Sequence, residues 1–339
     1  CPSLLLEPAS TNLVTYSEAF DNVYWTKSGA SVTSDFISPD GTSNAFKLIE
    51  DTSNAKHRIF TNAVGTSKAF SFFAKADGRN WVSVLSNNGN SSFFDIGNGV
   101  VGTVAGGSIG KIEPIGNNGW YRCTLYNSHP TFGAYVGLAK SDNLETYIGD
   151  GTSGALIYGA QLEALSYATS YIPNFGQSAG VTRAVESCFG AGTASTFNST
   201  EGVLYLDFAS LNNAGNYRLI SLSDGTTSNR LFIGFRLDTG YLYYFVIVAG
   251  STQASNITTI TATDFTKVAV KWKANDFALW VDGVEISSDT SGISFPADTL
   301  NTIQMNEGDG AGFEFYGKVK DVRVYNEALT DAQLQTLTT

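Results

Sequence analysis

The segment 268–286, VAVKWKANDFALWVDGVEI, constrains the fold most, because its side chains alternate and a turn is encoded within it. Apolar side chains fall on every second residue from Val268 and again from Phe277. This period of two is typical of a β-strand, whose successive side chains point to opposite faces. The pair Asp282-Gly283 favours a two-residue type I′ turn, since both central positions need a positive φ. The segment predicts antiparallel β-sheet.

A change of parity near the end of the chain predicts a β-bulge. Val319 lies on an odd position, whereas Val322 and the valine two residues later lie on even positions. If all three side chains face one core, an extra residue is inserted near Lys320 or Asp321. After this strand the pattern becomes helical, so the chain is expected to end in a short helix or turn with Thr330 as its N-cap.

These two passages resemble the laminin-G-like, or concanavalin-like, sandwich family, whose members often close with a strand of the type G-x-V-x-D-V-R-V-Y-N-x-A-L. The resemblance covers about residues 200–339 and implies a β-sandwich. It leaves the function open, because the family contains sugar binders, protein binders, hydrolases and structural domains. The matching residues are Gly317, Val319, Asp321, Val322, Arg323, Val324, Tyr325, Asn326, Ala328 and Leu329.

Composition favours an extracellular or surface protein made of short strands. Of 339 residues, only 15% are charged and 35 are glycine, which is typical of strands joined by polar turns. The net charge of −11 argues against a nucleic-acid partner, which needs clustered lysine and arginine. No apolar run is long enough to span a membrane. Because the chain starts with Cys1, we interpret it as an ordered portion of a longer protein.

The three cysteines have no metal-binding spacing. Cys123 lies in an alternating strand and is expected to be a small buried thiol. Cys1 and Cys188 flank the first domain and are candidates for a disulfide in an oxidising exterior, although the sequence does not supply the Cα separation that such a bond requires.

Turn clusters divide the first part of the chain into short alternating runs, which predicts a jelly roll over residues 1–184. Residues 185–200 lose the alternation and are rich in small and polar side chains, so we expect a linker there and a second sandwich over 201–339. The fold class is therefore all-β, with two β-sandwich (jelly-roll) domains in tandem.

The first domain resembles a module that recurs in bacteriophage tail and virion-surface proteins and is similar to carbohydrate-binding jelly rolls. The resemblance covers about residues 1–184 and implies a surface protein, without naming the ligand. Its four motifs occur in the same order and are PSLLLEPASTNL at 2–13, YSEAFDNVYWTKSGA at 16–30, SPDGTSNAFKL at 38–48 and YGAQLEALSYATSYIPNFGQSAGVTRA at 158–184.

Catalytic constellations are not evident. His57 and His129 lie beside no nucleophile elbow or metal-ligand spacing, so both are expected to be ordinary turn or surface residues. Glu50 and Asp51 are adjacent and would point to opposite faces of a strand. We therefore expect no enzymatic activity, and an acid pair for glycoside hydrolysis could come only from residues distant in sequence.

An outward platform is predicted on the strands around the 238–240 turn. The more aliphatic side chains of both strands should face the core. The opposite set combines aromatic and basic residues, which suit the apolar faces and hydroxyls of a sugar, including an anionic glycan. Alternatively, these side chains pack across strands or against another subunit. The carbohydrate-binding candidates are Arg230, Phe232, Arg236, Tyr241 and Tyr243.

The glycine-rich segment NEGDGAG at 306–312 offers a second candidate site. Its carboxylates, Glu307 and Asp309, could bind a structural calcium ion, which prefers several oxygen ligands on flexible backbone. The spacing is not that of an EF-hand, and the alternative is a solvated turn.

Together these features predict a non-catalytic protein of a virion surface or tail fibre, or more generally an extracellular protein, that binds cell-surface or extracellular glycans. Its expected partners are the glycan, other virion proteins and further copies of itself in a homo-oligomer. Two alternatives remain open: an accessory carbohydrate-binding region of a secreted polysaccharide-degrading enzyme, and a purely structural knob for decoration or oligomerisation.

Overall fold

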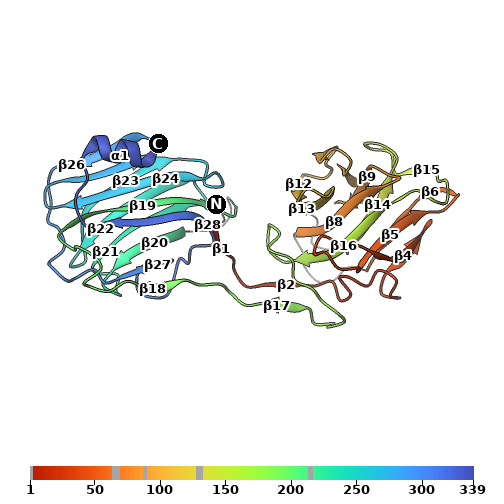
Figure 1. Ribbon diagram of the computed structural model, residues 1–339, viewed down its shortest axis with the longest axis horizontal. Helices are drawn as coiled ribbons and strands as arrows, with labels where there is room; N and C mark the ends of the chain where they lie inside the picture. The colour runs from red at the N-terminus through yellow and green to blue at the C-terminus, as the bar shows by residue number, and fades with distance from the viewer. Residues whose placement is uncertain (1–2, 63–68, 87–89, 127–132, 213–216) are drawn as a thin grey trace. The chain divides into compact units, whose positions relative to one another are not determined.

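The computed structural model describes residues 3–62, 69–86, 90–126, 133–212 and 217–339. The chain divides into two compact units. Unit 1 consists of the residues up to Pro8 together with Val185–Thr339, and unit 2 is Ala9–Ala184. The strands of each unit, visible in Figure 1, pair in antiparallel sheets. The expected all-β fold class is confirmed.

The domain limits differ from the sequence expectation at two places. The residues up to Pro8 belong to unit 1 rather than to the first domain, because β1 (Leu4–Leu6) pairs with the last strand and buries Leu6 in the core of unit 1. The segment 185–200, expected to be a linker, is also part of unit 1 and contains the paired strand β18 (Phe189–Ala191). Unit 2 is thus inserted between β1 and the rest of unit 1.

Among the described residues, unit 1 is a sandwich of two six-stranded sheets, which we name the β19 sheet and the β21 sheet. The β19 sheet consists, in order, of β1, β28 (Gly317–Tyr325), β19 (Glu201–Ser210), β24 (Thr266–Lys273), β25 (Phe277–Val281) and β26 (Val284–Asp289). The β21 sheet consists, in order, of β18, β27 (Thr302–Gln304), β20 (Tyr217–Ser223), β21 (Arg230–Arg236), β22 (Tyr241–Val248) and β23 (Ser251–Thr259).

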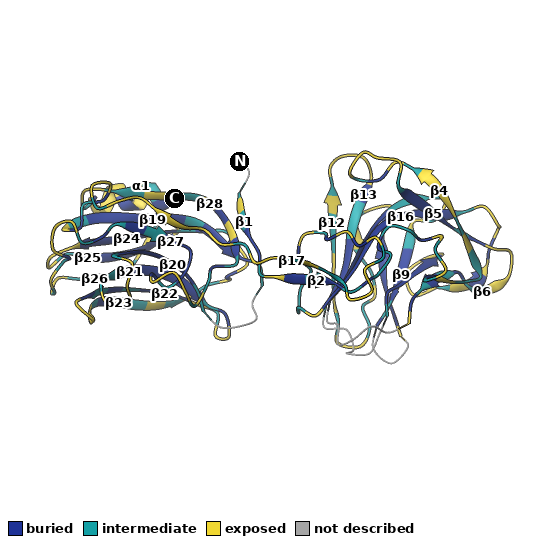
Figure 2. Ribbon diagram, turned by 90° about the horizontal axis from the view of Figure 1, so that it is seen from below, coloured by how far each residue is buried: buried dark blue, intermediate teal, exposed yellow. Residues whose placement is uncertain are grey.

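The core of unit 1 lies between these two sheets. Phe208 of β19 stacks on Phe235 of β21 with ring centroids 4.4 Å apart, and Trp272 of β24 is fully buried in the same core. Figure 2 shows the buried faces as dark blue stretches along the strands. The alternation seen in the sequence therefore places one side of each strand in a common core.

Three local predictions in unit 1 are confirmed. Asp282 and Gly283 have φ values of +46° and +82° in the two-residue turn between β25 and β26. In the pairing of β19 with β28, Asp207 lies opposite Asp321 and Phe208 opposite Val319, so the bulge lies at Lys320. The chain ends in α1 (Asp331–Thr338), and Thr330 is its N-cap.

Helix α1 covers the outer face of the β19 sheet. Its Leu334 is fully buried against Trp280, which is 6% exposed, and against Leu329 of the preceding turn. It is the one α-helix among the described residues, and no helix described here is long and apolar enough to cross a membrane. The chain itself therefore covers part of this outer face, over β24, β25 and β26.

In its described residues, unit 2 is also a sandwich of two six-stranded sheets, the β9 sheet and the β8 sheet. The β9 sheet consists of β11 (Val100–Val101), β10 (Ser91–Asp95), β9 (Trp81–Leu85), β14 (Tyr135–Ala139), β7 (Arg58–Phe60) and β3 (Thr26–Ser28). The β8 sheet consists of β12 (Ile109–Ile115), β13 (Trp120–Tyr126), β8 (Ala69–Asp77), β16 (Gly154–Glu163), β5 (Ala45–Glu50) and β4 (Ala30–Phe36). Two ribbons pair β15 (Thr146–Ile148) with β6 (Asn54–Lys56), and β17 (Val181–Arg183) with β2 (Ser10–Asn12).

The core of unit 2 contains the cysteine expected to be buried. Cys123 is fully buried with a free thiol, and burial raises the pKa of this thiol. Cys188, in unit 1, is exposed with a free thiol, while Cys1 lies outside the described residues. The disulfide between Cys1 and Cys188 stays a prediction.

Candidate functional site

The outer face of the β21 sheet carries the predicted platform residues. Leu231, Ile233 and Phe235 point into the core of unit 1, which confirms the predicted facing of β21. The alternate residues lie on the outer face, where Arg236 is paired with Tyr241 on the neighbouring strand. All five predicted carbohydrate-binding residues therefore lie on one side of two adjacent strands.

Phe232 and Tyr243 are much less accessible than an outward platform requires. They are 6% and 7% exposed, respectively. Phe232 lies 5.7 Å from Tyr243 and 5.3 Å from Phe245, and Tyr217 lies 5.4 Å from Tyr243, all between ring centroids. Large side chains on paired strands cover one another, so this part of the prediction is corrected. We call Tyr217, Phe232, Tyr243 and Phe245 the aromatic cluster.

Three apolar side chains around the aromatic cluster reach solvent. Tyr241 is 37% exposed, Ile257 is 56% exposed and Phe313 is 40% exposed. Ile257 is the register partner of Tyr243, and the ring of Phe313 packs 5.0 Å from that of Tyr217. We call these three residues the apolar rim. In contrast to the β19 sheet, this outer face carries no helix among the described residues.

The arginines of this face are paired with carboxylates. Arg230 donates from one terminal nitrogen to Glu307 Oε2 at 3.2 Å, and Arg236 Nε lies 3.1 Å from Asp238 Oδ1. The hydrogen bond that Arg236 donates to Asp238 raises the pKa of Arg236. The expected basic surface for an anionic glycan is therefore corrected, because each positive charge has a negative neighbour.

The two predicted calcium ligands, Glu307 and Asp309, accept hydrogen bonds from other groups of the protein. Glu307 accepts from Arg230, and Asp309 Oδ1 accepts from the Ala311 amide at 3.0 Å within the same loop. The described part of the chain contains no group of three His, Cys, Asp or Glu side chains that could hold a metal ion. Both carboxylates therefore have partners within the protein, and the calcium site stays a prediction.

Ile257, Phe313 and Tyr217 also lie on this face but were not predicted from the sequence. Ile257 lies in the polar run STQASNITT, and its place opposite Tyr243 follows only from the pairing of β22 with β23. Phe313 follows the glycine-rich loop, where no periodic pattern exists, and reaches β20 through a bond from the Leu219 amide to its carbonyl oxygen. The alternation of β20 could have identified Tyr217.

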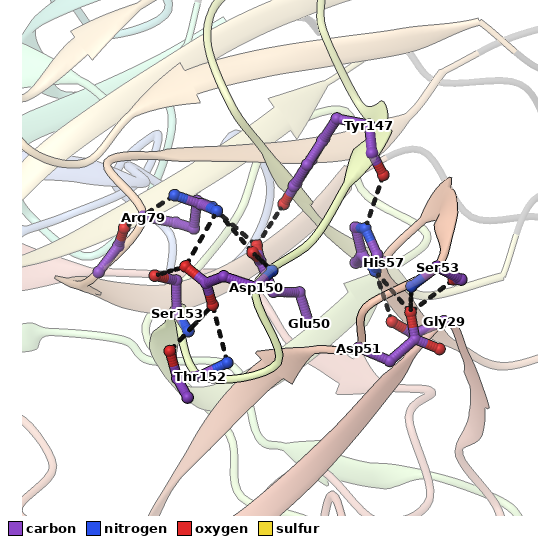
Figure 3. A network of polar contacts seen from close by, with 11 residues as sticks. Gly29, Glu50, Asp51, Ser53, His57, Arg79, Tyr147, Asp150, Thr152 and Ser153 are labelled. Atoms are coloured by element: carbon purple, nitrogen blue, oxygen red, sulfur yellow. Dashed lines mark hydrogen bonds and ion pairs between the residues drawn. The ribbon is translucent and has the colours of Figure 1, made fainter.

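In unit 2, a buried ion pair organises the loop after β15 (Figure 3). Glu50 is 1% exposed and accepts hydrogen bonds from Arg79 Nε at 2.7 Å, from Tyr147 OH at 2.8 Å and from the Asp150 amide at 2.8 Å. Arg79 adds a second bond from its terminal nitrogen at 2.5 Å. A carboxylate satisfied by this many donors stabilises structure and has little capacity left for acid–base chemistry.

His57 differs from the surface residue that was expected. It is fully buried, with Nδ1 2.5 Å from the Gly29 carbonyl oxygen and Nε2 3.1 Å from that of Tyr147. Its ring thus ties the junction of β6 and β7 to the bend at Gly29 and to β15, and Nδ1 also lies 3.5 Å from Asp51 Oδ1 (Figure 3). The expectation for His129 lies outside the described residues.

Two carboxylates of unit 2 that are distant in sequence lie close together. Tyr158 OH is 2.9 Å from Asp40 Oδ2 and 3.1 Å from Glu18 Oε1. Burial would raise the pKa of Asp40, but hydrogen bonds from Ser38 and Thr42 outweigh it and lower that pKa well below its usual range. Asp40 therefore lacks the raised pKa that the general acid of a glycoside hydrolase needs.

Residues 194–335 match a family model described as the Concanavalin A-like lectin/glucanases superfamily, of the laminin-G type. The matched residues lie in unit 1, so this part of the chain is similar to laminin-G-type sandwiches, as the resemblance in its last strand implied. No curated protein matches the sequence.

Solved structures with a similar fold include the following three. One is the CBM40 of the Ruminococcus gnavus IT-sialidase bound to alpha2,3 sialyllactose, at 17% identity over 45% of this chain and 97% of that chain, with a TM-score of 0.37. A leech intramolecular trans-sialidase has 21% identity over 41% of this chain and 23% of that chain, with a TM-score of 0.36. A heptameric SAP-like pentraxin from Limulus polyphemus has 16% identity over 44% of this chain and 74% of that chain, with a TM-score of 0.35. These distant likenesses concern the fold alone.

Proposed function

We propose that unit 1 binds a cell-surface or extracellular glycan on the outer face of the β21 sheet. One observation supports this above the others: the apolar rim of Tyr241, Ile257 and Phe313 stays open to solvent, whereas the chain covers the opposite outer face with α1. Exposed aromatic and aliphatic side chains on a rigid sheet are suited to the apolar C–H faces of a pyranose ring.

The charge distribution favours a neutral glycan. Arg236 and Asp238 form an exposed pair beside Tyr241, and both side chains can exchange hydrogen bonds with sugar hydroxyls. A carboxylate on the sugar would meet Asp238 and Glu307 as well as the arginines. We therefore expect hydroxyl recognition rather than capture of an anion.

The setting that we propose is a virion surface or tail fibre, with other virion proteins as partners and no catalytic step. The resemblance of residues 1–184 to phage surface modules is the support for this setting. An accessory region of a polysaccharide-degrading enzyme is the rival, and the neighbouring reading frames distinguish the two: virion assembly genes support the first, and a catalytic domain in the same protein supports the second.

A glycan array probed with the whole chain tests the binding function. Tyr241→Ala should reduce binding at least tenfold, since loss of an aromatic anchor removes a large share of an interface's energy. Val284→Ala is the matched control, because Val284 is 58% exposed on β26 in the other sheet. Equal binding by wild type and Tyr241→Ala, or no glycan bound at all, would contradict the proposal.

The apolar rim also favours a second function, that of a structural knob. Three exposed apolar side chains on one face could equally be buried against another copy of the chain. Analytical ultracentrifugation distinguishes the two functions: a knob should form an oligomer that Tyr241→Ala or Ile257→Asp dissociates, and it should bind no sugar.

A further inference from the structure

Three polar atoms without hydrogen-bond partners lie next to the aromatic cluster. They are Ser221 Oγ, Gln304 Oε1 and Arg230 Nε. Ser221 is fully buried and Gln304 is 7% exposed. The register of the β21 sheet places Ser221 directly opposite both Gln304 and Phe232. Buried polar groups are paired in most proteins, so three such atoms on adjoining residues mark an unusual place in this sandwich.

The glycine-rich loop, residues 306–312, covers these atoms. A methyl group on Gly308 would lie 3.3 Å from Ser221 Oγ, and one on Gly310 would lie 3.9 Å from Gln304 Oε1. The backbone of the loop therefore rests on both side chains. Because a larger side chain at Gly308 would contact the serines beneath it, glycine is needed for this close approach.

A few side chains hold the loop closed. The carbonyl oxygen of Gly308 accepts from Ser223 Oγ at 2.7 Å and from Gln304 Nε2 at 3.2 Å, while the carbonyl oxygen of Glu307 accepts from Arg230 at 2.5 Å. Other features make the closed position of the loop less favourable. Phe313, just after the loop, has φ +48°, which is unfavourable for a bulky residue, and each unpaired buried group disfavours closure by about a factor of ten.

We propose that residues 306–312 are a lid over a polar subsite, formed by Ser221, Gln304 and Arg230, which receives neighbouring hydroxyl groups of the glycan bound on the aromatic face. This inference rests on the proposed function. Gln304 Oε1 accepts from one hydroxyl, Arg230 Nε donates to it or to the next, and Ser221 Oγ can do either. Glu307, paired with Arg230, disfavours a carboxylate in the same place, so the subsite selects a neutral vicinal diol.

Hydrogen exchange of the loop amides tests the lid without any ligand, and two serine variants make opposite predictions. Ser221→Ala removes a hydroxyl that closure leaves unpaired, so exchange should slow about tenfold. Ser223→Ala removes a bond that closes the loop, so exchange should become about tenfold faster. Equal exchange in wild type and both variants, or a shift of both in the same direction, would overturn the lid.

Binding of simple sugars tests the subsite. The probes are the methyl glycosides of glucose, galactose and mannose, each compared with its uronic acid counterpart, and binding is measured by protein NMR. At least one neutral glycoside should shift signals of the loop and bind at least tenfold more tightly than its uronate. Ser221→Ala should weaken this binding about tenfold, whereas Val284→Ala should not.

Each failure has its own signature. A wild-type protein that binds none of the six probes, or binds uronates as tightly, overturns the subsite, even if the array finds other glycans. A blank array overturns the proposed function, and the exchange experiment still decides whether the lid exists. If Ser221→Ala changes neither exchange nor binding, the three atoms bind buried water only and the inference is wrong.

Discussion

Leu4 pairs with Val319, so the first described strand of the chain lies beside the last one. The residues between β1 and β18 leave unit 1, form unit 2 and return. Near this point of return, the Glu7 amide donates to the Glu186 carboxylate at 2.9 Å, and the Glu186 amide donates to the Glu7 carbonyl oxygen at 3.0 Å. The start of the chain is thus a structural part of the laminin-G-like unit.

Leu6→Ala should destabilise unit 1 and leave unit 2 unchanged. Leu6 is 4% exposed in the core of unit 1, and truncation of a buried leucine costs about 2–4 kcal/mol. In differential scanning calorimetry of the whole chain, the unfolding transition of unit 1 should move to a lower temperature and that of unit 2 should stay where it is. Leu4→Ala is the control, since Leu4 is 45% exposed on the same strand. A shift of the unit 2 transition would contradict this division of the chain.

Glu50→Gln should destabilise unit 2 by about 3 kcal/mol, because it removes the buried partner of Arg79 and leaves only the more exposed Asp150, 3.5 Å away, as its counter-charge. Urea unfolding measures the change. Asp77→Asn is the matched control: Asp77 pairs with Lys47 at 2.9 Å, but its side chain is 43% exposed, so the cost should stay below about 1 kcal/mol. Similar losses in both variants would argue against a structural role for the Glu50 network.

Unit 2 should lose stability in acid through Asp150. Hydrogen bonds from Ser153 and Thr152 hold the pKa of Asp150 well below its ordinary value of 3.8. A carboxyl with a lowered folded-state pKa stabilises the fold above its unfolded pKa, and this contribution disappears as the pH falls through the folded pKa. The melting temperatures of wild type and Asp150→Asn should therefore differ above about pH 5, and the difference should shrink progressively as the pH falls below 3.8 towards the lowered folded-state pKa. A difference independent of pH would exclude this explanation.

Tyr243→Ala and Tyr241→Ala should separate packing from binding on the same face. Tyr243 is 7% exposed, so its loss should destabilise unit 1 by about 3 kcal/mol. Tyr241 is 37% exposed, and its loss should change stability by less than about 0.5 kcal/mol. Urea denaturation followed by tryptophan fluorescence measures both variants. Equal losses of unfolding free energy in the two variants would mean that the aromatic cluster is as open to solvent as the apolar rim.

Calcium should not stabilise unit 1. Glu307 is paired with Arg230, and a cation in the loop would have to displace this guanidinium or lie next to it. The melting temperature of unit 1 should be the same in millimolar calcium and in excess chelator. A rise in calcium that Asp309→Asn abolishes would restore the calcium site predicted from sequence.

Local patterns predicted the strands, the turn at Asp282 and the bulge at Lys320 because each depends on residues close in sequence. The alternation of side chains along β21 also predicted which of its faces points into the core. It could not predict that Phe232 and Tyr243 cover each other, since exposure on one face depends on neighbouring strands and not on parity.

Long-range contacts determine the limits of the units and the partner of Glu307, and local patterns could not predict them. The pairing of Leu4 with Val319 joins residues at opposite ends of the chain, and nothing near Leu4 specifies that partner. Glu307 is predicted as a calcium ligand because its loop is acidic and rich in glycine, and this prediction takes no account of Arg230. Its pairing with Arg230 depends on the return of this loop to the β21 sheet.

The pairing of β1 with β28 also determines how the molecule would bear a mechanical load. Tension between a point before Leu4 and a point after Tyr325 would pass through the hydrogen bonds between these two strands and bypass the inserted unit. Unit 2 would stay unstretched until β1 is torn from its sheet. Unit 1 would therefore carry a load applied at these two points while unit 2 stays relaxed.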